Sequence, residues 1–543
     1  MKIGLALSSL NRWNCFFLLF FIIITFFSFL NIEQSYSPLK YNEYFGLDKL
    51  ISYYAEFQID FKNFLRNTLA FHEGYSAYSR YSFYVLLPQF VGVKLLGGLS
   101  YSNLYRVSVF FGLVSIVVLY LFLKKYWNYK VAFFSCFFYG CSPWFQELFR
   151  SSNYQGLSVF LAMVILFLSF RLMATKGTLQ IVLAFILGVT IGIGYYYYAV
   201  LRVLILLGGL FIWRNQKNRF KIVLFYFLGI VLILSPGIYL KLQQGGVFFA
   251  GYETCLGDKN PWVSMAMRIF GTMRQIFAKN VVQGGPEGLA FHSRLLDPWL
   301  GFPFILGIWC FITKRRKGQN GLFNLFFLLL MMPILIMSHC QVRRLVLLII
   351  PLYVYTGGGV SCIYTFLQKI KDFKSKKMGY FLQILFVFLV IFIGLKQLVY
   401  SKQYILENER TLGFLRVGQE IKRQNIQGEL LVLKRDSSSL IYEIKDEVFI
   451  ILENYKKYST GELKIEAANF NEMKQRLLKG DVSSIFLVVT PFFEDDIVGN
   501  WIREKGFHIY QKAKVLTPPV LIVTRETKNP YFELLLIEGT KGK

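Results

Sequence analysis

Apolar runs long enough to cross a lipid bilayer recur along the first 400 residues of the chain. The first run, residues 15–30, consists mainly of Phe, Leu and Ile and carries no charge. An α-helix rises ~1.5 Å per residue, so ~20 apolar residues span the hydrocarbon core. The pattern therefore predicts a polytopic α-helical membrane protein of about eleven spans. The later runs lie at about 102–123, 131–146, 157–174, 179–197, 199–213, 222–240, 298–313, 321–338, 343–366 and 380–399.

Two long polar segments interrupt these runs. We expect the opening run to be an uncleaved anchor, because residues 32–36 make a poor signal-peptide cleavage site. The segment that follows, 32–101, is a predicted loop, and a second predicted loop covers 241–297. Within the first loop, Tyr81–Leu96 is apolar but short and contains a proline, a glutamine and a lysine, which predicts a helix lying in the membrane interface.

The pattern changes after residue 400, where charges of both signs mix with short β-branched runs. Amphipathic stretches such as 470–478 and 496–505 separate these runs. Strands that alternate with helical patterns predict a small α/β domain over residues 401–543, with the membrane domain over 1–400. This segment has no glycine-rich phosphate loop, so we expect an accessory domain. The predicted strands include 429–433, 484–489 and 520–523.

Basic residues cluster between the apolar runs and predict the orientation of the chain. The net charge is +28, yet the positions of the clusters indicate topology signals and contact with membrane lipids, not with nucleic acid. With the N-terminus in the cytoplasm and eleven spans, the clusters all fall on the cytoplasmic side. We therefore expect a multi-pass protein of the plasma (inner) membrane whose loops 32–101 and 241–297 and C-terminal domain are exported. The clusters are Lys124/Lys125/Lys130, Arg171/Lys176, Arg214/Lys217/Arg219/Lys221, Lys314/Arg315/Arg316/Lys317 and Lys369/Lys371/Lys374/Lys376/Lys377.

Composition agrees with this class and predicts no metal site. Hydrophobic residues make up 55% of the chain and charged residues only 17%, more apolar surface than a soluble domain hides. The seven cysteines and four histidines have no metal-ligand spacing. The sequence therefore indicates no particular cofactor. A requirement for a divalent cation, Mg²⁺ or Mn²⁺, is left open.

More than half of the acidic residues in the predicted exported parts of the membrane domain, residues 1–400, lie in the loop 32–101, and two of them are candidate catalytic bases. A general base needs a carboxylate within hydrogen-bond reach of the acceptor group. Glu43 and Asp48 lie five residues apart, so on one helix they face about 140° away from each other. They form a close pair only if the chain bends at Gly46. The alternative is that these acids only solvate the loop. Asp297 is a further acid, at the end of the second loop, and a candidate substrate-binding residue.

Arginines in or beside the spans, on the predicted exported side, are candidates for binding a phosphate. The planar guanidinium grips phosphate through two parallel hydrogen bonds. The alternative is that they extend to the membrane interface or pair with an acid. Tyrosines such as Tyr198, at the outer end of a span, are explained by the aromatic belt at the membrane interface. Stacking of one or two of them on a sugar is left open. The arginines are Arg80, Arg106, Arg150, Arg202, Arg343 and Arg344.

Several of these segments together resemble the membrane glycosyltransferases of the GT-C fold. The resemblance covers roughly residues 10–400 and is to the bacterial relatives of dolichyl-phosphate-mannose protein mannosyltransferases and of the aminoarabinose transferase of lipid A. The matching segments, in chain order, are Asn42 to Asp48, Arg106, Ser142-Pro143-Trp144 with Phe149-Arg150, Gly194 to Arg202, Leu295 to Gly301 and Arg344 to Pro351.

This resemblance implies a cell-envelope transferase. It implies transfer of a hexose or pentose from a polyprenyl-phosphate-linked sugar to an envelope lipid, glycan or protein, the last being protein glycosylation, with inversion at the anomeric carbon. The family's base is the first acid of the pair after the first span, where this sequence has Asn42, which cannot accept a proton. Either Glu43 or Asp48 has the role, the register differs by one, or the chain is an inactive relative. An acid near the family's interfacial helix is also replaced, by Tyr81 and Ser82.

A lipid or glycan transporter is the alternative from another class. It predicts inverted repeats, broken helices and charges near the membrane midplane. The sequence instead has large exported loops and a soluble exported domain, so we expect the transferase.

Overall fold

The structure is a computed structural model, and it describes the chain in segments. The described residues are 12–29, 47–69, 83–98, 101–149, 154–197, 199–207, 219–243, 295–313, 317–336, 342–373, 376–407, 428–434, 463–469, 484–489, 508–516 and 531–538, with a few isolated positions.

The chain divides into two compact units. The first takes in Met1–Ile32, Leu50–Val281 and Phe291–Lys402, and the second takes in Gln403–Lys543 with two short pieces, Glu33–Lys49 and Val282–Ala290. Because the second unit includes pieces of the first 400 residues, the boundary near residue 400 stays a prediction.

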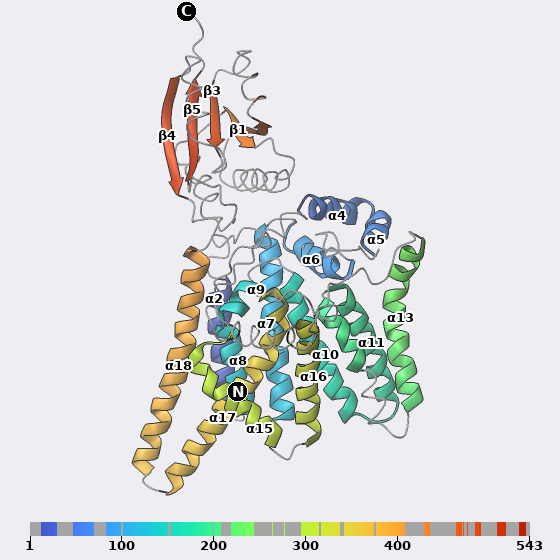
Figure 1. The fold of residues 1–543 in the computed structure, drawn as a ribbon, viewed down its shortest axis with the longest axis vertical. Helices are drawn as coiled ribbons and strands as arrows, with labels where there is room; N and C mark the ends of the chain where they lie inside the picture. Colours follow the sequence, from blue (N-terminus) through green and yellow to red (C-terminus); the bar gives the residue numbers. More distant parts are fainter. Residues whose placement is uncertain are drawn as a thin grey trace, which may run out of the picture. The chain divides into compact units, whose positions relative to one another are not determined.

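The first unit is a helical bundle (Figure 1). Six of its helices are long and apolar enough to cross a membrane, and they coincide with predicted runs: Asn103–Tyr126, Gly156–Ala174, Thr178–Tyr197, Phe220–Tyr239, Leu345–Lys369 and Tyr380–Tyr400. The protein is therefore multi-pass, and the count of eleven stays a prediction. The helices are α2 (Arg12–Phe29), α4 (Leu47–Ile59), α5 (Phe61–Leu69), α6 (Phe83–Leu95), α7 (Tyr101–Tyr126), α8 (Tyr129–Cys141), α9 (Pro143–Phe149), α10 (Tyr154–Ala174), α11 (Thr178–Tyr197), α13 (Arg219–Gln243), α15 (Gly301–Thr313), α16 (Lys317–Ile336), α17 (Ile349–Phe373) and α18 (Lys376–Glu407), with 3₁₀ helices η2 (Ala199–Ile205), η4 (Pro298–Leu300) and η5 (Val342–Leu348).

Two predicted spans differ from continuous α-helices. The run 131–146 is divided into α8 and α9, because Ser142 has the extended backbone that a residue before proline prefers and Pro143 begins the next helix. The run 199–213 begins as the 3₁₀ helix η2, and its residues from 208 onward lie outside the described part. Hydropathy does not distinguish a 3₁₀ from an α-helix, so this difference could not be read from the pattern.

Glycines bring neighbouring helices into backbone contact. A Cβ at Gly307 of α15 would collide with the carbonyl oxygen of Tyr355 in α17, and one at Gly359 of α17 would collide with that of Pro303. A Cβ at Gly188 of α11 would likewise strike the carbonyl of Tyr226 in α13. Small residues permit this close packing, which is the main attraction between helices in lipid. The α15–α17 and α11–α13 pairs are therefore tightly fixed.

Helix α17 provides the interior against which the site described below is built. From Leu345 in η5 to Tyr355, every residue is buried, including the proline at 351. Its hydroxyls find partners in the bundle, as in Tyr355, which donates to Asn324 Oδ1 at 2.7 Å. An apolar helix that is enclosed on all sides keeps its polar groups in fixed positions.

The second unit contains a five-stranded mixed sheet in the order β2-β1-β3-β5-β4. Strand β1 is parallel to β2 and β3, with Leu430 opposite Ile465 and Phe486, and β5 is antiparallel to β3 and β4. Strands β1 and β3 match predicted strands, and the predicted strand 520–523 lies outside the described residues. Parallel pairs need crossover connections, as in an α/β domain; the helices of this domain stay a prediction. The strands are β1 (Gly428–Lys434), β2 (Leu463–Asn469), β3 (Ser484–Val489), β4 (His508–Leu516) and β5 (Tyr531–Glu538).

Candidate functional site

The predicted catalytic acids lie at or beyond the edge of the described structure. Asn42 and Glu43 lie outside the described residues, and Asp48 lies in the first turn of α4 with its side chain outside the description. Their assignment as base candidates stays a prediction. Among the predicted binding residues, Arg80, Arg150 and Tyr198 also lie outside the described part, and Arg343 and Arg344 are placed by backbone alone, in η5.

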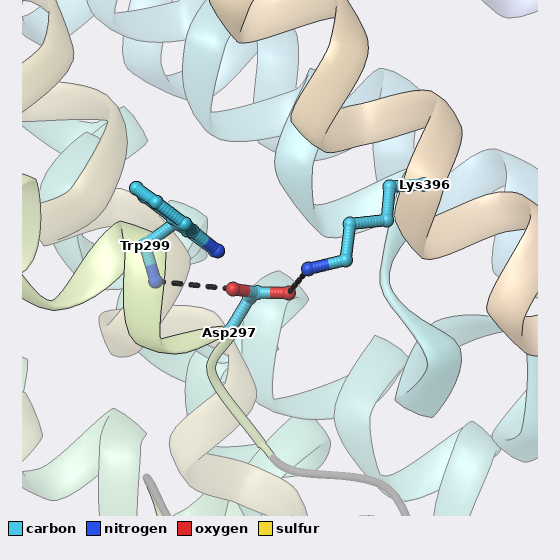
Figure 2. Close-up of polar contacts among 3 residues, drawn as sticks. All are labelled: Asp297, Trp299 and Lys396. Atoms are coloured by element: carbon cyan, nitrogen blue, oxygen red, sulfur yellow. Dashed lines mark hydrogen bonds and ion pairs between the residues drawn. The ribbon is translucent and has the colours of Figure 1, made fainter.

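Asp297 and Lys396 form an ion pair between the segment before η4 and the last helix of the bundle. Oδ2 of Asp297 lies 3.7 Å from Nζ of Lys396 in α18, while Oδ1 accepts a 3.0 Å hydrogen bond from the backbone N–H of Trp299 (Figure 2). The second bond makes Asp297 the N-cap of η4. The Asp297 side chain is 16% exposed and Lys396 is 49% exposed. The carboxylate is thus held in one orientation by two donors.

Lys396 was not among the residues singled out from the sequence. It is a lysine within the predicted span 380–399 and within the candidate span Tyr380–Tyr400. A charge within an apolar helix is costly in lipid unless it has a partner, so it marks a functional candidate. That signal was present in the sequence, but its partner lies 99 positions earlier and could not be identified without the fold.

Tyr353 brings three of the resemblance segments together. Its hydroxyl donates a 2.9 Å hydrogen bond to the carbonyl of Leu295, and it lies close enough to the Ser142 hydroxyl and the Asp297 carboxylate to be influenced by both. Tyr353 follows the segment Arg344 to Pro351 by one turn at most. Segments far apart in the chain therefore meet around one buried phenol, which sequence reasoning missed.

Ser142 connects this cluster to the break between α8 and α9. Its Oγ accepts a 3.1 Å hydrogen bond from the N–H of Phe145 and donates to the carbonyl of Tyr139 at 2.8 Å. Gln146, buried one turn later, donates to the carbonyl of Gly140 at 3.1 Å and contacts Ser28 of α2. Buried polar groups that are all partnered hold a rigid geometry. We call Ser142, Asp297, Tyr353 and Lys396 the Asp297 cluster.

Arg202 lies at a second place in the helical unit, against Tyr195. Its guanidinium carbon is 4.4 Å from the centre of the Tyr195 ring, and its Nε donates to the Tyr195 carbonyl at 3.4 Å. These two contacts restrain the guanidinium, and a restrained guanidinium suits a phosphate ligand because less conformational freedom is lost on binding. The neighbouring tyrosines are structural: Tyr196 donates to Ile233, and Tyr197 donates to the carbonyl of Tyr84 in α6 at 2.8 Å.

The Tyr84 phenol is part of the same packing. Burial raises its pKa above the ordinary value, so the group stays protonated. The centre of its ring lies 5.0 Å from the centre of the Tyr196 ring. A helix is thus present in the segment predicted to lie in the interface, as α6, and it is attached to α11; its position in the membrane interface stays a prediction.

Arg106 has a structural contact of its own. Nη1 donates to Oδ1 of Asn103 at 3.4 Å, and Asn103 in turn donates to the carbonyls of Leu96 and Gly98. Gly97 and Gly98 have φ angles of 96° and 117°, which favour glycine, at the turn between α6 and α7. Arg106 supports this turn.

A metal site is not formed by the described residues. Within that part of the chain, no group of three or more His, Cys, Asp or Glu side chains could hold a metal ion. Because the acids of the first loop lie partly outside it, the prediction of no metal site stays a prediction.

Residues 89–239 match the family model described as dolichyl-phosphate-mannose-protein mannosyltransferase. The resemblance inferred from the sequence is therefore confirmed over this stretch, which contains α7 to α11 and most of α13. No curated protein sequence matches the chain.

The fold is similar to that of several solved structures. They include ArnT from Cupriavidus metallidurans in the apo state (9% identity, 83% of this chain, 87% of that one, TM-score 0.42) and the same enzyme bound to undecaprenyl phosphate (9%, 84%, 87%, 0.42). Another is the oligosaccharyltransferase of Archaeoglobus fulgidus with zinc and sulfate (12%, 78% of this chain, 60% of that one, 0.39). With TM-scores below 0.5, no site detail is carried over from them.

Proposed function

We propose that this multi-pass membrane protein, related over residues 89–239 to the dolichyl-phosphate-mannose-protein mannosyltransferases, transfers a sugar from a polyprenyl-phosphate donor to an acceptor on the exported face of the membrane. The family match is the observation that carries the proposal, since the family's name specifies a sugar on a polyprenyl phosphate. The acceptor is an envelope lipid, glycan or protein.

The reaction divides into a proton transfer and a displacement. An acceptor oxygen attacks the anomeric carbon, the bond from that carbon to the phosphate oxygen breaks, and polyprenyl phosphate leaves with inversion. Glu43 or Asp48 takes the acceptor proton. Arg202, with Arg343 and Arg344, stabilises the negative charge that develops on the leaving phosphate. The contact of the Arg202 guanidinium with the Tyr195 ring, which restrains the group, supports this role.

We assign the Asp297 cluster a positioning role. Both carboxylate oxygens of Asp297 already have partners within the chain, a backbone N–H and an ammonium. A carboxylate whose two oxygens are both occupied in this way is poorly placed to accept a proton from an acceptor group. Asp297 therefore holds the segment before η4 against α17 and α18, and the substrate contacts predicted for it arise through this segment.

The proposed topology has eleven spans, with the N-terminus in the cytoplasm and the α/β domain of residues 401–543 on the exported side of the inner membrane. The described basic residues support it, since Lys124, Lys125, Lys130 and Arg171 occur at helix ends that the positive-inside rule assigns to the cytoplasm. The mixed sheet supports an accessory α/β domain.

Incubating membranes that contain the protein with a labelled polyprenyl-phosphate sugar tests this function. Transfer of label to an acceptor with release of polyprenyl phosphate supports the enzyme. Movement of intact lipid across the membrane supports the transporter, and binding without either outcome supports the inactive relative for which Asn42 argues.

Paired variants then identify the base. We expect Glu43→Gln or Asp48→Asn, but not both, to lower the rate about 10²–10⁴-fold, as loss of a general base does. Asp60→Asn is the matched control: Asp60 is exposed between α4 and α5 and caps the N–H of Asn63, a role that asparagine also fills. Full activity in both test variants would remove the loop acids from the mechanism.

A further inference from the structure

We infer that the adjoining ends of α7 and α10 form a binding site for the headgroup of an anionic phospholipid, in which Lys125 and Arg171 contact the phosphodiester. This site is separate from the proposed transferase site, and the inference does not depend on the proposed function.

The two cations come from neighbouring helices and face the same region. Lys125 lies in the last turn of α7 and Arg171 in the last turn of α10, and these helices pack against each other (Figure 1). Their charges are close enough to repel each other, and both side chains are exposed. No described carboxylate forms an ion pair with either of them. A bound anion would remove this repulsion, and a phosphodiester accepts hydrogen bonds from both ammonium and guanidinium.

Other cations nearby are already engaged by the protein. Nζ of Lys130 donates to Oε1 of Gln368 at 2.6 Å and lies 5.0 Å from the centre of the Tyr364 ring. Lys124 lies 5.0 Å from the ring centre of Tyr129. Lys124 and Lys130 are also half-buried, whereas Lys125 and Arg171 are exposed, so this pair is the more accessible to a ligand.

Apolar surface directly beside the pair identifies a lipid in preference to a free phosphate. Leu121 precedes Lys125 by one helical turn and is 52% exposed. Phe167 precedes Arg171 by one turn, and its ring centre lies 5.9 Å from the guanidinium. Residues four apart lie on the same helix face. On each helix, an apolar side chain therefore lies one turn from the cation, on the side toward the middle of the span. An acyl chain can cover this side chain.

Aromatic residues lie at the same end of α7 as Lys125. The Tyr126 ring centre is 5.5 Å from Nζ of Lys125. Trp127 donates from Nε1 to Oδ1 of Asn320 at 3.0 Å and stacks on Phe311. Tyrosine and tryptophan are enriched at the membrane–water interface, which agrees with a headgroup at this depth.

Native mass spectrometry of the purified full chain, with phosphatidylglycerol and phosphatidylcholine supplied in turn, tests the inference. We expect phosphatidylglycerol adducts to exceed phosphatidylcholine adducts, and Lys125→Gln and Arg171→Gln each to weaken phosphatidylglycerol binding about five-fold, the effect of one cation near an anionic headgroup. Arg171→Lys should retain most of the binding because it retains the charge.

Lys176→Gln is the matched control, because Lys176 is an exposed cation just beyond the end of α10. Equal losses in Lys176→Gln and Arg171→Gln would show diffuse attraction to the basic surface and overturn the site. Competition by millimolar glycerol 3-phosphate as effective as that by the lipid would overturn the assignment to a phospholipid. Thermal unfolding of each variant in phosphatidylcholine alone shows that it is folded.

Discussion

Nζ of Lys396 lies 3.7 Å from Oδ2 of Asp297, so that the ion pair joins α18 to the segment that precedes η4. Removal of either partner leaves the other charge next to apolar helices. We expect Lys396→Met and Asp297→Asn each to lower the melting temperature in detergent. The double variant should lose less than the sum of the two, with a coupling of about 0.5–3 kcal/mol.

Lys221→Met provides the control for this cycle. Lys221 is an exposed lysine at the start of another apolar helix, α13, so the substitution removes a similar charge from a comparable position. Additive losses for Lys396→Met and Asp297→Asn would contradict the coupling.

The Tyr353 hydroxyl satisfies the carbonyl of Leu295 within the bundle, at 2.9 Å. Tyr353→Phe keeps the ring and removes the donor, and we expect it to lower stability by about 1–3 kcal/mol because a buried acceptor loses its bond. Thermal unfolding measures the loss. Tyr129→Phe is the comparison, since the described contact of Tyr129, with Lys124, is made by its ring; a similar loss in both variants would argue against a specific role for the Tyr353 hydroxyl.

Gly307 lets the backbones of α15 and α17 touch, and a methyl group at this position would collide with the carbonyl of Tyr355. We expect Gly307→Ala to destabilise the fold by about 1–3 kcal/mol through overpacking. Gly321→Ala in α16 meets open space, so it should be neutral or stabilising by up to about 1 kcal/mol through helix propensity. Unfolding curves for the pair compare the two directly, and equal behaviour would mean that the α15–α17 contact is looser than described.

The Arg202 guanidinium is oriented by the Tyr195 ring. If Arg202 binds the leaving phosphate, Arg202→Lys should reduce sugar transfer at least ten-fold despite keeping the charge, because the planar fork is lost. Tyr195→Phe should have a smaller effect, since it keeps a ring and the backbone carbonyl that accepts from Nε. Assays with varied donor concentration distinguish loss of binding from loss of turnover. Unchanged transfer by Arg202→Lys would exclude the phosphate role.

The hydropathy pattern was sufficient to locate the six long apolar helices, because burial in lipid requires long uncharged runs whatever their partners. It did not reveal the division at Ser142, although the proline at 143 is a signal for it. Asp297 could be chosen from the sequence as a rare acid near a span. Its partners Lys396 and Tyr353 could not, because their meeting depends on how helices pack and not on spacing along the chain.

The hydrogen bond from Tyr197 to the carbonyl of Tyr84 and the contact between the Tyr84 and Tyr196 rings attach α6 to the end of α11. Arg202 follows that end by five residues and stacks on Tyr195 within it. The position of α6 therefore bears on the place of the Arg202 guanidinium through a short chain of contacts, Tyr84 to Tyr197 and Tyr195 to Arg202.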